Sequence, residues 1–394
     1  MKARTVALAV LLAVPALVVA CNGILGIDAP ILASDGGTDA ATRPDRIVTT
    51  DSKAMTDAGH DARRPGDTGV GDAHDGSAPR PDGAAPDAGR DAPPAFTGTC
   101  SCPSLPDGGC APVLLASNQA NPTAIAADPD AGVFWVNYAQ DGGSVWARGL
   151  TAAATPAPVS QSEELASGIG YGHGFVYWTD TVVGLRRGAL PHGPAATVDT
   201  VFAAEGLALG ATKAFVASDT FGQIAEYNLL DGGQSLLTSA AGSAPDKVGV
   251  DAVNVYWSAS GAVYGCPQTG CGFFPTVYGR SGGPNGVASN GTTLFWADSS
   301  AGAVYSVPVN PVGGTADGGA TTLLFTAASP SRVAADDSHV YVVAGSQILR
   351  ANLDGTHLVA IANGVSPSDL ALAGSCVYWL DDTPGTGRVY ASAK

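Results

Sequence analysis

The sequence has few charged residues and lacks the short motifs that carry common enzyme chemistry. Only 14% of its 394 residues are charged. It contains no G-x-S-x-G nucleophile elbow, no Walker loop, no H-E-x-x-H pair and no dinucleotide-binding fingerprint. The sequence therefore gives no motif-based ground for an esterase, a nucleotide-dependent enzyme or a metalloprotease.

Basic residues are scarce as well. The chain has 19 Lys and Arg against 35 Asp and Glu, which gives a formal net charge of −16. Residues 100–394 alone hold 22 acidic and 10 basic residues, so the imbalance is not confined to one end. Phosphate backbones and anionic lipid headgroups would be repelled by this charge. We therefore expect no nucleic-acid partner.

The chain also lacks a hydrophobic run long enough for a comfortable membrane span. Its longest candidate, residues 5–20, follows Lys2 and Arg4 and is typical of an export signal, which we place at residues 1–20. The run ends in the letters VVAC, which resemble the lipobox of bacterial lipoproteins. This resemblance implies a lipid anchor on Cys21, and Asn22 implies sorting to the outer membrane. Ordinary cleavage that leaves Cys21 as a free thiol is the alternative.

Large apolar side chains are rare between residues 21 and 99, where Asp, Ala, Gly, Pro and Arg recur. Such a segment cannot bury enough surface to offset the entropy of ordering it, so we predict a disordered tether. As a flexible coil it would hold the following domain roughly 50 Å from its anchor. Its aspartates lack the spacing of an EF-hand, which favours an acidic spacer over a calcium site.

The chain is rich in glycine and in one repeated unit. Seven similar segments follow residue 100, and they align at Trp135, Trp178, Val216, Trp257, Trp296, Val342 and Trp379. The mean spacing of about 41 residues matches a propeller blade of four strands. Five of the six tryptophans occupy this one position, where they would fill the wedges between blades. We predict an all-β fold, a seven-bladed β-propeller over residues 100–394.

The two ends of the repeat region predict how the ring closes. The seventh repeat stops after its third strand, at GRVYASAK, and the segment PVLLAS at residues 112–117 precedes the first repeat without a blade of its own. Pairing the two would complete the last blade and remove an exposed edge. We therefore expect residues 112–117 to supply the closing strand.

The letters YWTD at residues 177–180 match the repeat that names the YWTD propellers of lipoprotein-receptor ectodomains. Residues 112–394 resemble that group and the NHL-like propellers. The receptor modules have six blades, whereas seven repeats are present here, and only one repeat carries the full tetrad. The resemblance implies the blade architecture and no specific ligand.

Six cysteines besides Cys21 lie in an exported domain, where an even number favours disulfides: Cys100, Cys102, Cys110, Cys266, Cys271 and Cys376. We predict the pair Cys266–Cys271, which closes a short loop. At least one bond should join the segment 100–110 to Cys376, because both flank the expected seam. A zinc site of four thiolates is the alternative.

Aspartates recur at two fixed positions of the repeat, after the aromatic strand and at the end of the first strand. Recurrence once per blade keeps them apart around the ring, so we expect them to bind turn amides rather than form a catalytic dyad. Streptogramin-type lyases and gluconolactonase-like enzymes are propellers with a metal at the channel mouth. No pairing of His and Glu at that mouth is evident in the repeats, and we expect no metal and no cofactor.

Polar residues that do not repeat follow the proline at the start of most first strands: Thr123, Asp246, Lys247, Asn285, Ser331, Arg332, Ser368 and Asp369. Loops that enter first strands gather around one mouth of a propeller channel, so we predict that these residues form a binding rim. Solvated turns are the alternative. The favoured function is a membrane-anchored surface or periplasmic module that binds a protein or glycan. A metal-dependent lyase or lactonase-like enzyme and a structural envelope protein are the alternatives.

Overall fold

The computed structural model describes residue 100 and residues 111–139, 142–190, 193–200, 203–309 and 321–394. The expected signal peptide, lipidated Cys21 and the tether lie outside the described residues, as do Cys102 and Cys110. The described residues form 28 strands and no helix. They accordingly contain no helix long and apolar enough to cross a membrane.

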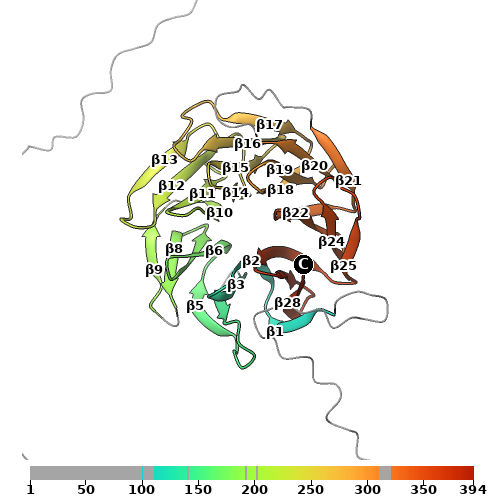
Figure 1. Ribbon diagram of the computed structural model, residues 1–394. Coiled ribbons are helices and arrows are strands. Elements are labelled where there is room, and N and C mark those ends of the chain that lie inside the picture. Colours follow the sequence, from blue (N-terminus) through green and yellow to red (C-terminus); the bar gives the residue numbers. More distant parts are fainter. Residues whose placement is uncertain (1–99, 101–110, 140–141, 191–192, 201–202, 310–320) are drawn as a thin grey trace, which may run out of the picture. The chain divides into compact units, whose positions relative to one another are not determined.

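The strands form seven antiparallel sheets of four strands, arranged as blades around a central axis (Figure 1). This confirms the predicted all-β, seven-bladed propeller. Blade one contains β2 (Pro122–Asp128), β3 (Gly132–Asn137), β4 (Gly143–Arg148) and β5 (Ala157–Glu163). Blade two contains β6 (Ala166–Gly172), β7 (Phe175–Asp180), β8 (Gly184–Ala189) and β9 (Ala196–Asp199). Blade three contains β10 (Ala204–Leu209), β11 (Lys213–Ser218), β12 (Gln223–Asn228) and β13 (Gln234–Thr238).

The remaining four blades follow the same order from the axis outward. Blade four contains β14 (Val248–Val250), β15 (Asn254–Ala259), β16 (Ala262–Pro267) and β17 (Thr276–Arg280). Blade five contains β18 (Pro284–Ser289), β19 (Thr293–Asp298), β20 (Ala303–Pro308) and β21 (Thr322–Thr326). Blade six contains β22 (Pro330–Ala335), β23 (His339–Ala344), β24 (Gln347–Asn352) and β25 (Val359–Asn363). Blade seven contains β26 (Pro367–Ala373), β27 (Cys376–Asp381), β28 (Gly387–Ala393) and β1 (Val113–Gln119).

The ring closes as predicted, because β1 is the outermost strand of blade seven and pairs antiparallel with β28. The strand spans residues 113–119, slightly beyond the expected 112–117. A disulfide between Cys100 and Cys376 ties the same seam across a sequence separation of 276 residues. Closing so long a loop is worth about 5 kcal/mol on the chain-entropy model. Two independent devices therefore hold the first and last blades together.

The predicted Cys266–Cys271 disulfide is also present. It follows the third strand of blade four and spans a sequence separation of 5 residues. The same chain-entropy model gives it about 2 kcal/mol. The two disulfides therefore differ in role, since one closes the ring and the other fixes a single loop.

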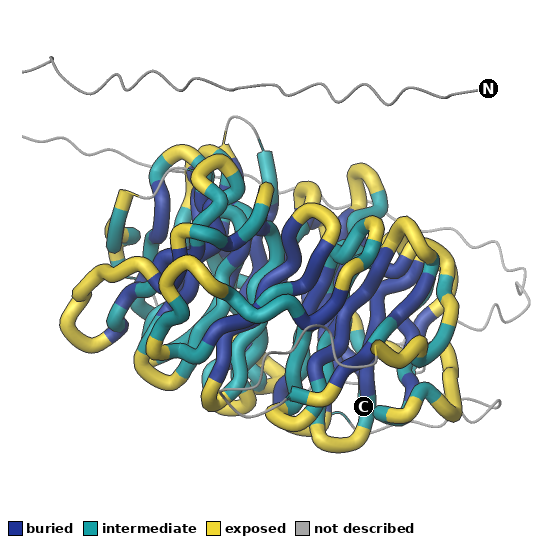
Figure 2. The backbone as a smooth tube through the Cα atoms, turned by 90° about the horizontal axis from the view of Figure 1, so that it is seen from above, coloured by how far each residue is buried: buried dark blue, intermediate teal, exposed yellow. Residues whose placement is uncertain are grey.

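The core lies in the wedges between blades, where the second strands present their aromatic side chains. The five tryptophans of the repeat position are completely buried: Trp135, Trp178, Trp257, Trp296 and Trp379. Each packs against the preceding blade, and Trp178 for example shares a cluster with Phe134 and Val136 of blade one. Figure 2 shows the result, with buried strand segments inside and exposed turns at both ends. The predicted wedge-filling role of these residues is confirmed.

The recurring aspartates bind turn amides, as expected. Asp180, at the end of β7, is fully buried and accepts four backbone N–H groups, from Glu164 and Leu165 at 3.1 and 3.2 Å and from Val182 and Val183 at 2.9 Å. A buried carboxylate is tolerable only with such donors. The YWTD segment is therefore structural, since Trp178 and Tyr177 fill the wedges on either side of blade two and the aspartate fixes two turns.

Candidate functional site at the channel mouth

The site residues lie at the beginning of the seven innermost strands, which surround the channel axis. In six of the seven blades the pairing between first and second strand shifts register across the first two or three residues of the inner strand. Such a bulge leaves residues outside the regular ladder and redirects their side chains. Proline at the first position fits this arrangement, because it has no N–H to donate to the ladder. The bulges therefore turn non-repeating side chains toward the channel.

This geometry corrects one part of the sequence interpretation. Most of the predicted rim residues do not lie in loops before the first strands. Six of them lie within strands: Thr123 in β2, Asn285 in β18, Ser331 and Arg332 in β22, and Ser368 and Asp369 in β26. Asp246 and Lys247 directly precede β14. The strands begin earlier than expected because the proline itself pairs with the end of the second strand, as Pro122 does with Asn137.

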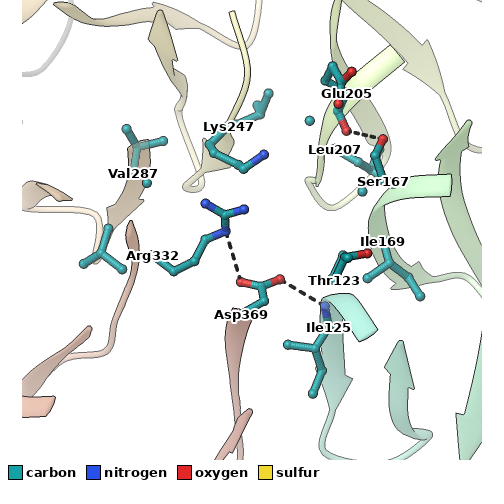
Figure 3. Close-up of a pocket in the computed structure, with 16 residues that line it drawn as sticks. Thr123, Ile125, Ser167, Ile169, Glu205, Leu207, Lys247, Val287, Arg332 and Asp369 are labelled. Atoms are coloured by element: carbon teal, nitrogen blue, oxygen red, sulfur yellow. Dashed lines mark hydrogen bonds and ion pairs between the residues drawn. The ribbon is translucent and has the colours of Figure 1, made fainter. Parts of the chain in front are cut away.

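Four of the predicted residues line one cavity of about 150 Å³ in the channel: Thr123, Lys247, Arg332 and Asp369. Figure 3 shows that Lys247, Arg332 and Asp369 converge on it from three different blades. Ile125, Ile169 and Val287 form part of its apolar wall. The cavity is therefore a small polar space with charged side chains fixed around it.

The other four predicted residues support these side chains without lining the cavity. Asp246 forms an ion pair with Lys247. Asn285 Oδ1 and the Ser331 carbonyl accept hydrogen bonds from Arg332 Nη1 at 3.1 and 3.0 Å. Ser368 donates to the carbonyl of Pro122 in the next blade at 2.6 Å. All eight residues thus belong to one arrangement, but only half of them face the cavity.

Asp369 is held by two backbone donors, one from blade one and one from its own strand, and by an ion pair with Arg332 of blade six. Its Oδ2 accepts the backbone N–H of Ile125 at 3.0 Å, and its Oδ1 accepts that of Leu370 at 2.9 Å. Arg332 Nε lies 3.6 Å from Oδ1. Burial raises the pKa of Asp369 above its ordinary value, and Arg332 with the two N–H groups only partly offsets this effect. Asp369 therefore acts as an internal anchor for Arg332.

Two cavity residues were missed by the sequence interpretation, Ser167 and Glu205. Alanine replaces proline before each of them, so the proline-based search passed over these blades. The spacing of the repeat could have found them. Ser167 and Glu205 precede the aligned positions Trp178 and Val216 by the same number of residues as the first predicted rim residue does in blades four to seven. Ser167 donates to the backbone carbonyl of Glu205 at 3.0 Å, which joins blades two and three at the channel.

Glu205 is the second carboxyl in the cavity wall. Burial raises its pKa, the charge of Lys247 lowers it, and Asp246 and Asp219 raise it further, with a net upward shift. Within the described residues its carboxylate has no hydrogen-bond or ion-pair partner. As the pH falls, Glu205 and Asp369 take up protons before ordinary carboxyls do. Lys247 and Arg332 then dominate the charge of the cavity.

Thr123 adds an unusual polar atom to the wall. Its hydroxyl is buried and has no hydrogen-bond partner among the described residues. A buried, unsatisfied hydroxyl costs about 1–3 kcal/mol, so its retention in the wall fits a group that meets a ligand or water. Within the part of the chain that the structure describes, no group of three or more His, Cys, Asp and Glu side chains is arranged as a metal site.

No protein-family model matches the chain, and no curated protein matches it. Solved structures of similar fold do exist. A catalytically inactive virginiamycin B lyase from Staphylococcus aureus, solved with quinupristin, is 12% identical, with 72% of this chain and 99% of that chain covered and a TM-score of 0.57. A hydrazine synthase chain from Kuenenia stuttgartiensis is 12% identical, with 70% and 96% covered and a TM-score of 0.58. At such identities the likeness shows the propeller fold alone.

Proposed function

We propose that the protein is a membrane-anchored lipoprotein of the cell envelope whose propeller is a binding module. The observation that carries this proposal is the convergence of Lys247, Arg332, Asp369 and Glu205 on one cavity, from four different blades. Side chains at these positions differ from blade to blade, whereas the scaffold beneath them repeats. Variation at one mouth of a constant scaffold is typical of a recognition surface.

The available groups in the cavity favour an anionic ligand group. Asp369 already accepts two backbone N–H groups and forms an ion pair with Arg332, whereas Arg332 donates through Nη1 and retains further N–H donors. Lys247 supplies a second cation beside it, as Figure 3 shows. A volume of about 150 Å³ is small compared with typical ligand pockets of roughly 300–1,000 Å³. The cavity therefore fits a carboxylate or phosphate at the tip of a larger ligand.

The test compares capture of envelope components by the full chain and by single charge variants. Arg332→Gln and Lys247→Gln should each reduce capture about tenfold or more, the effect expected when a charged hydrogen bond of about 1.5–3 kcal/mol is lost. Arg280→Gln removes the same charge from the exposed end of β17 in blade four and should have no effect. Capture should weaken with salt and strengthen on acidification, because Glu205 and Asp369 then lose their negative charge.

Equal capture by wild type and both channel variants would refute the binding role of the channel. The metal-dependent lyase or lactonase alternative would instead be established if a chelator abolished capture, a divalent ion restored it, and the metal-loaded chain converted a lactone or streptogramin substrate. The anchor is tested separately by labelling cells with palmitate. Label should be present in the full chain and absent from Cys21→Ala.

A further inference from the structure

A second cavity lies on the outer side of the ring, at the seam between blade seven and blade one. It has a volume of about 550 Å³, within the range of small-molecule sites. Its walls come from the end of the closing strand β1 and from β3, β4 and the segment before β5 in blade one. We call it the seam groove. Two strands of blade seven, β28 and β27, separate β1 from the channel-lining β26, so the groove is distinct from the charged cavity.

None of the ten residues that line the seam groove is charged. The polar ones carry amides and hydroxyls, and they include Ser117, Asn118, Gln119, Asn137 and Ser144. The uncharged lining of the seam groove differs from that of the channel cavity, which contains four charged side chains. A ligand that depends on ionic attraction would find no partner in the groove. A purely apolar ligand would leave the amides without partners, which is unfavourable for each buried group.

Trp146 supplies an aromatic wall. It is the one tryptophan outside the repeated core position, and it is half-buried on β4. One side of the indole stacks on the buried Trp135, with ring centroids 6.4 Å apart and an interplanar angle of 11°. Its Nε1 donates to Ser144 Oγ at 2.8 Å. These contacts fix the ring in one orientation while it lines the groove.

The amides of the groove are fixed in the same way. Gln119 Oε1 accepts hydrogen bonds from Trp135 Nε1 at 2.7 Å and from Asn137 Nδ2 at 3.0 Å. The two donors determine which way each amide points. Asn137 is only 5% exposed, and its Oδ1 has no donor among the described residues. The wall of the groove therefore contains an oriented amide whose carbonyl oxygen is buried without a donor among the described residues.

We propose that the seam groove binds an uncharged carbohydrate. A fixed aromatic ring offers a flat apolar surface to the C–H face of a sugar ring, and neighbouring amides and hydroxyls match its hydroxyl groups. The absence of charge in the lining fits a neutral saccharide better than a phosphate or a peptide terminus. One wall comes from β1, which completes blade seven, whereas the outermost strands of the other described blades come from the same repeat as their neighbours.

The experiment titrates the full chain with a panel of neutral oligosaccharides: maltotriose, cellotriose, galactotriose and triacetylchitotriose. Binding is followed by tryptophan fluorescence and by saturation-transfer NMR. At least one member should bind, with an affinity that is the same at low and high salt because no ion pair is involved. Trp146→Ala should weaken this binding about fivefold, since one stacked aromatic contributes roughly 1 kcal/mol.

Two further variants separate loss of the site from loss of the fold. Ser144→Ala should weaken binding several-fold while leaving the unfolding midpoint nearly unchanged. Tyr305→Ala removes the aromatic at the equivalent position of blade five, where it stacks on Trp296, and should not change sugar affinity. Lys247→Gln should also leave sugar binding intact, because that residue belongs to the channel cavity.

The proposal is overturned if no member of the panel binds. It is also overturned if Trp146→Ala and Ser144→Ala bind as well as wild type, or if binding falls steeply with salt. Loss of sugar binding in Lys247→Gln would move the saccharide to the channel instead. Failure of the channel to capture a charged component would not affect the seam groove, so the two sites are tested independently.

Discussion

The wedges between blades and the mouth of the channel are built from adjacent strands of the same repeat. They differ in burial, in charge and in whether their side chains recur from blade to blade. The wedges are filled by buried aromatic side chains that recur from blade to blade. The channel mouth carries Lys247, Arg332, Asp369 and Glu205, which do not recur. The wedge provides stability through apolar burial, whereas the channel retains charges and one unsatisfied hydroxyl. Within one blade, the second strand therefore stabilises the fold, while the start of the first strand supplies side chains to the site.

The largest effect should follow from breaking a wedge. Trp257 is fully buried, and its Nε1 donates to the Ala241 carbonyl at 2.7 Å. Trp257→Ala should lower the free energy of unfolding by about 3–5 kcal/mol, measured by urea denaturation. Lys247→Gln in the same blade is the matched control and should cost less than about 1 kcal/mol, as a partly exposed ion pair does. Similar losses for both variants would contradict the division between wedge and channel.

A smaller effect is expected at a carboxylate that links two blades. Asp251 accepts hydrogen bonds from the N–H groups of Val253 and Asn254 and from the hydroxyls of Tyr256 and Ser289. Burial by itself would raise its pKa, but these donors outweigh burial and lower it. Its stabilising contribution is therefore present above the unfolded pKa of about 3.9 and is lost as the pH falls through the folded value.

Replacing this carboxylate should accordingly have a pH-dependent cost. Asp251→Asn should reduce the free energy of unfolding by about 1–3 kcal/mol at neutral pH. The difference from wild type should shrink as the pH falls below about 3.9, where the wild type also loses the charge. Urea denaturation at several pH values measures it. The exposed Asp337, changed to Asn, should show no difference at any pH. If the difference in free energy of unfolding between wild type and Asp251→Asn stayed constant with pH, the charge of Asp251 would have no stabilising role.

The smallest effect should have the opposite sign and should sharpen the comparison. Thr123→Val replaces a buried, unpartnered hydroxyl by a methyl group of similar size, so stability should rise by about 1 kcal/mol. Thr179→Val is the control, because Thr179 Oγ1 accepts the N–H of Gly168 at 2.7 Å and donates to the Glu205 carbonyl at 2.8 Å. That variant should lose about 1–3 kcal/mol. A thermal midpoint that falls for Thr123→Val would show that the hydroxyl serves the fold.

Much of the fold was predictable because its signals are local and repeated. The aromatic position, the turn aspartates and the incomplete last repeat predict seven blades and their closure without reference to distant contacts. The site was less predictable. Proline identified rim positions in most blades, but it missed Ser167 and Glu205, where alanine stands instead. No sequence feature predicted the seam groove. Trp146 lies on a third strand at a position where other blades also carry an aromatic residue, so it does not stand out.

The blade number, the closing strand and the Cys266–Cys271 disulfide were predictable from the sequence, which also predicted a bond from the segment 100–110 to Cys376 without identifying Cys100 as the partner. These follow from periodicity and from cysteines near expected seams, which local chemistry encodes. The folded structure alone shows which polar side chains face the channel and that Gln119 and Asn137 meet at the seam. The physical reason is that bulges redirect the side chains at the start of the inner strands, and that β1 joins blade seven and so lies beside the end of β3 in blade one. The sequence predicts the ring closure and carries prolines near most of the bulges, but it does not specify which side chains these features bring together at the proposed ligand sites.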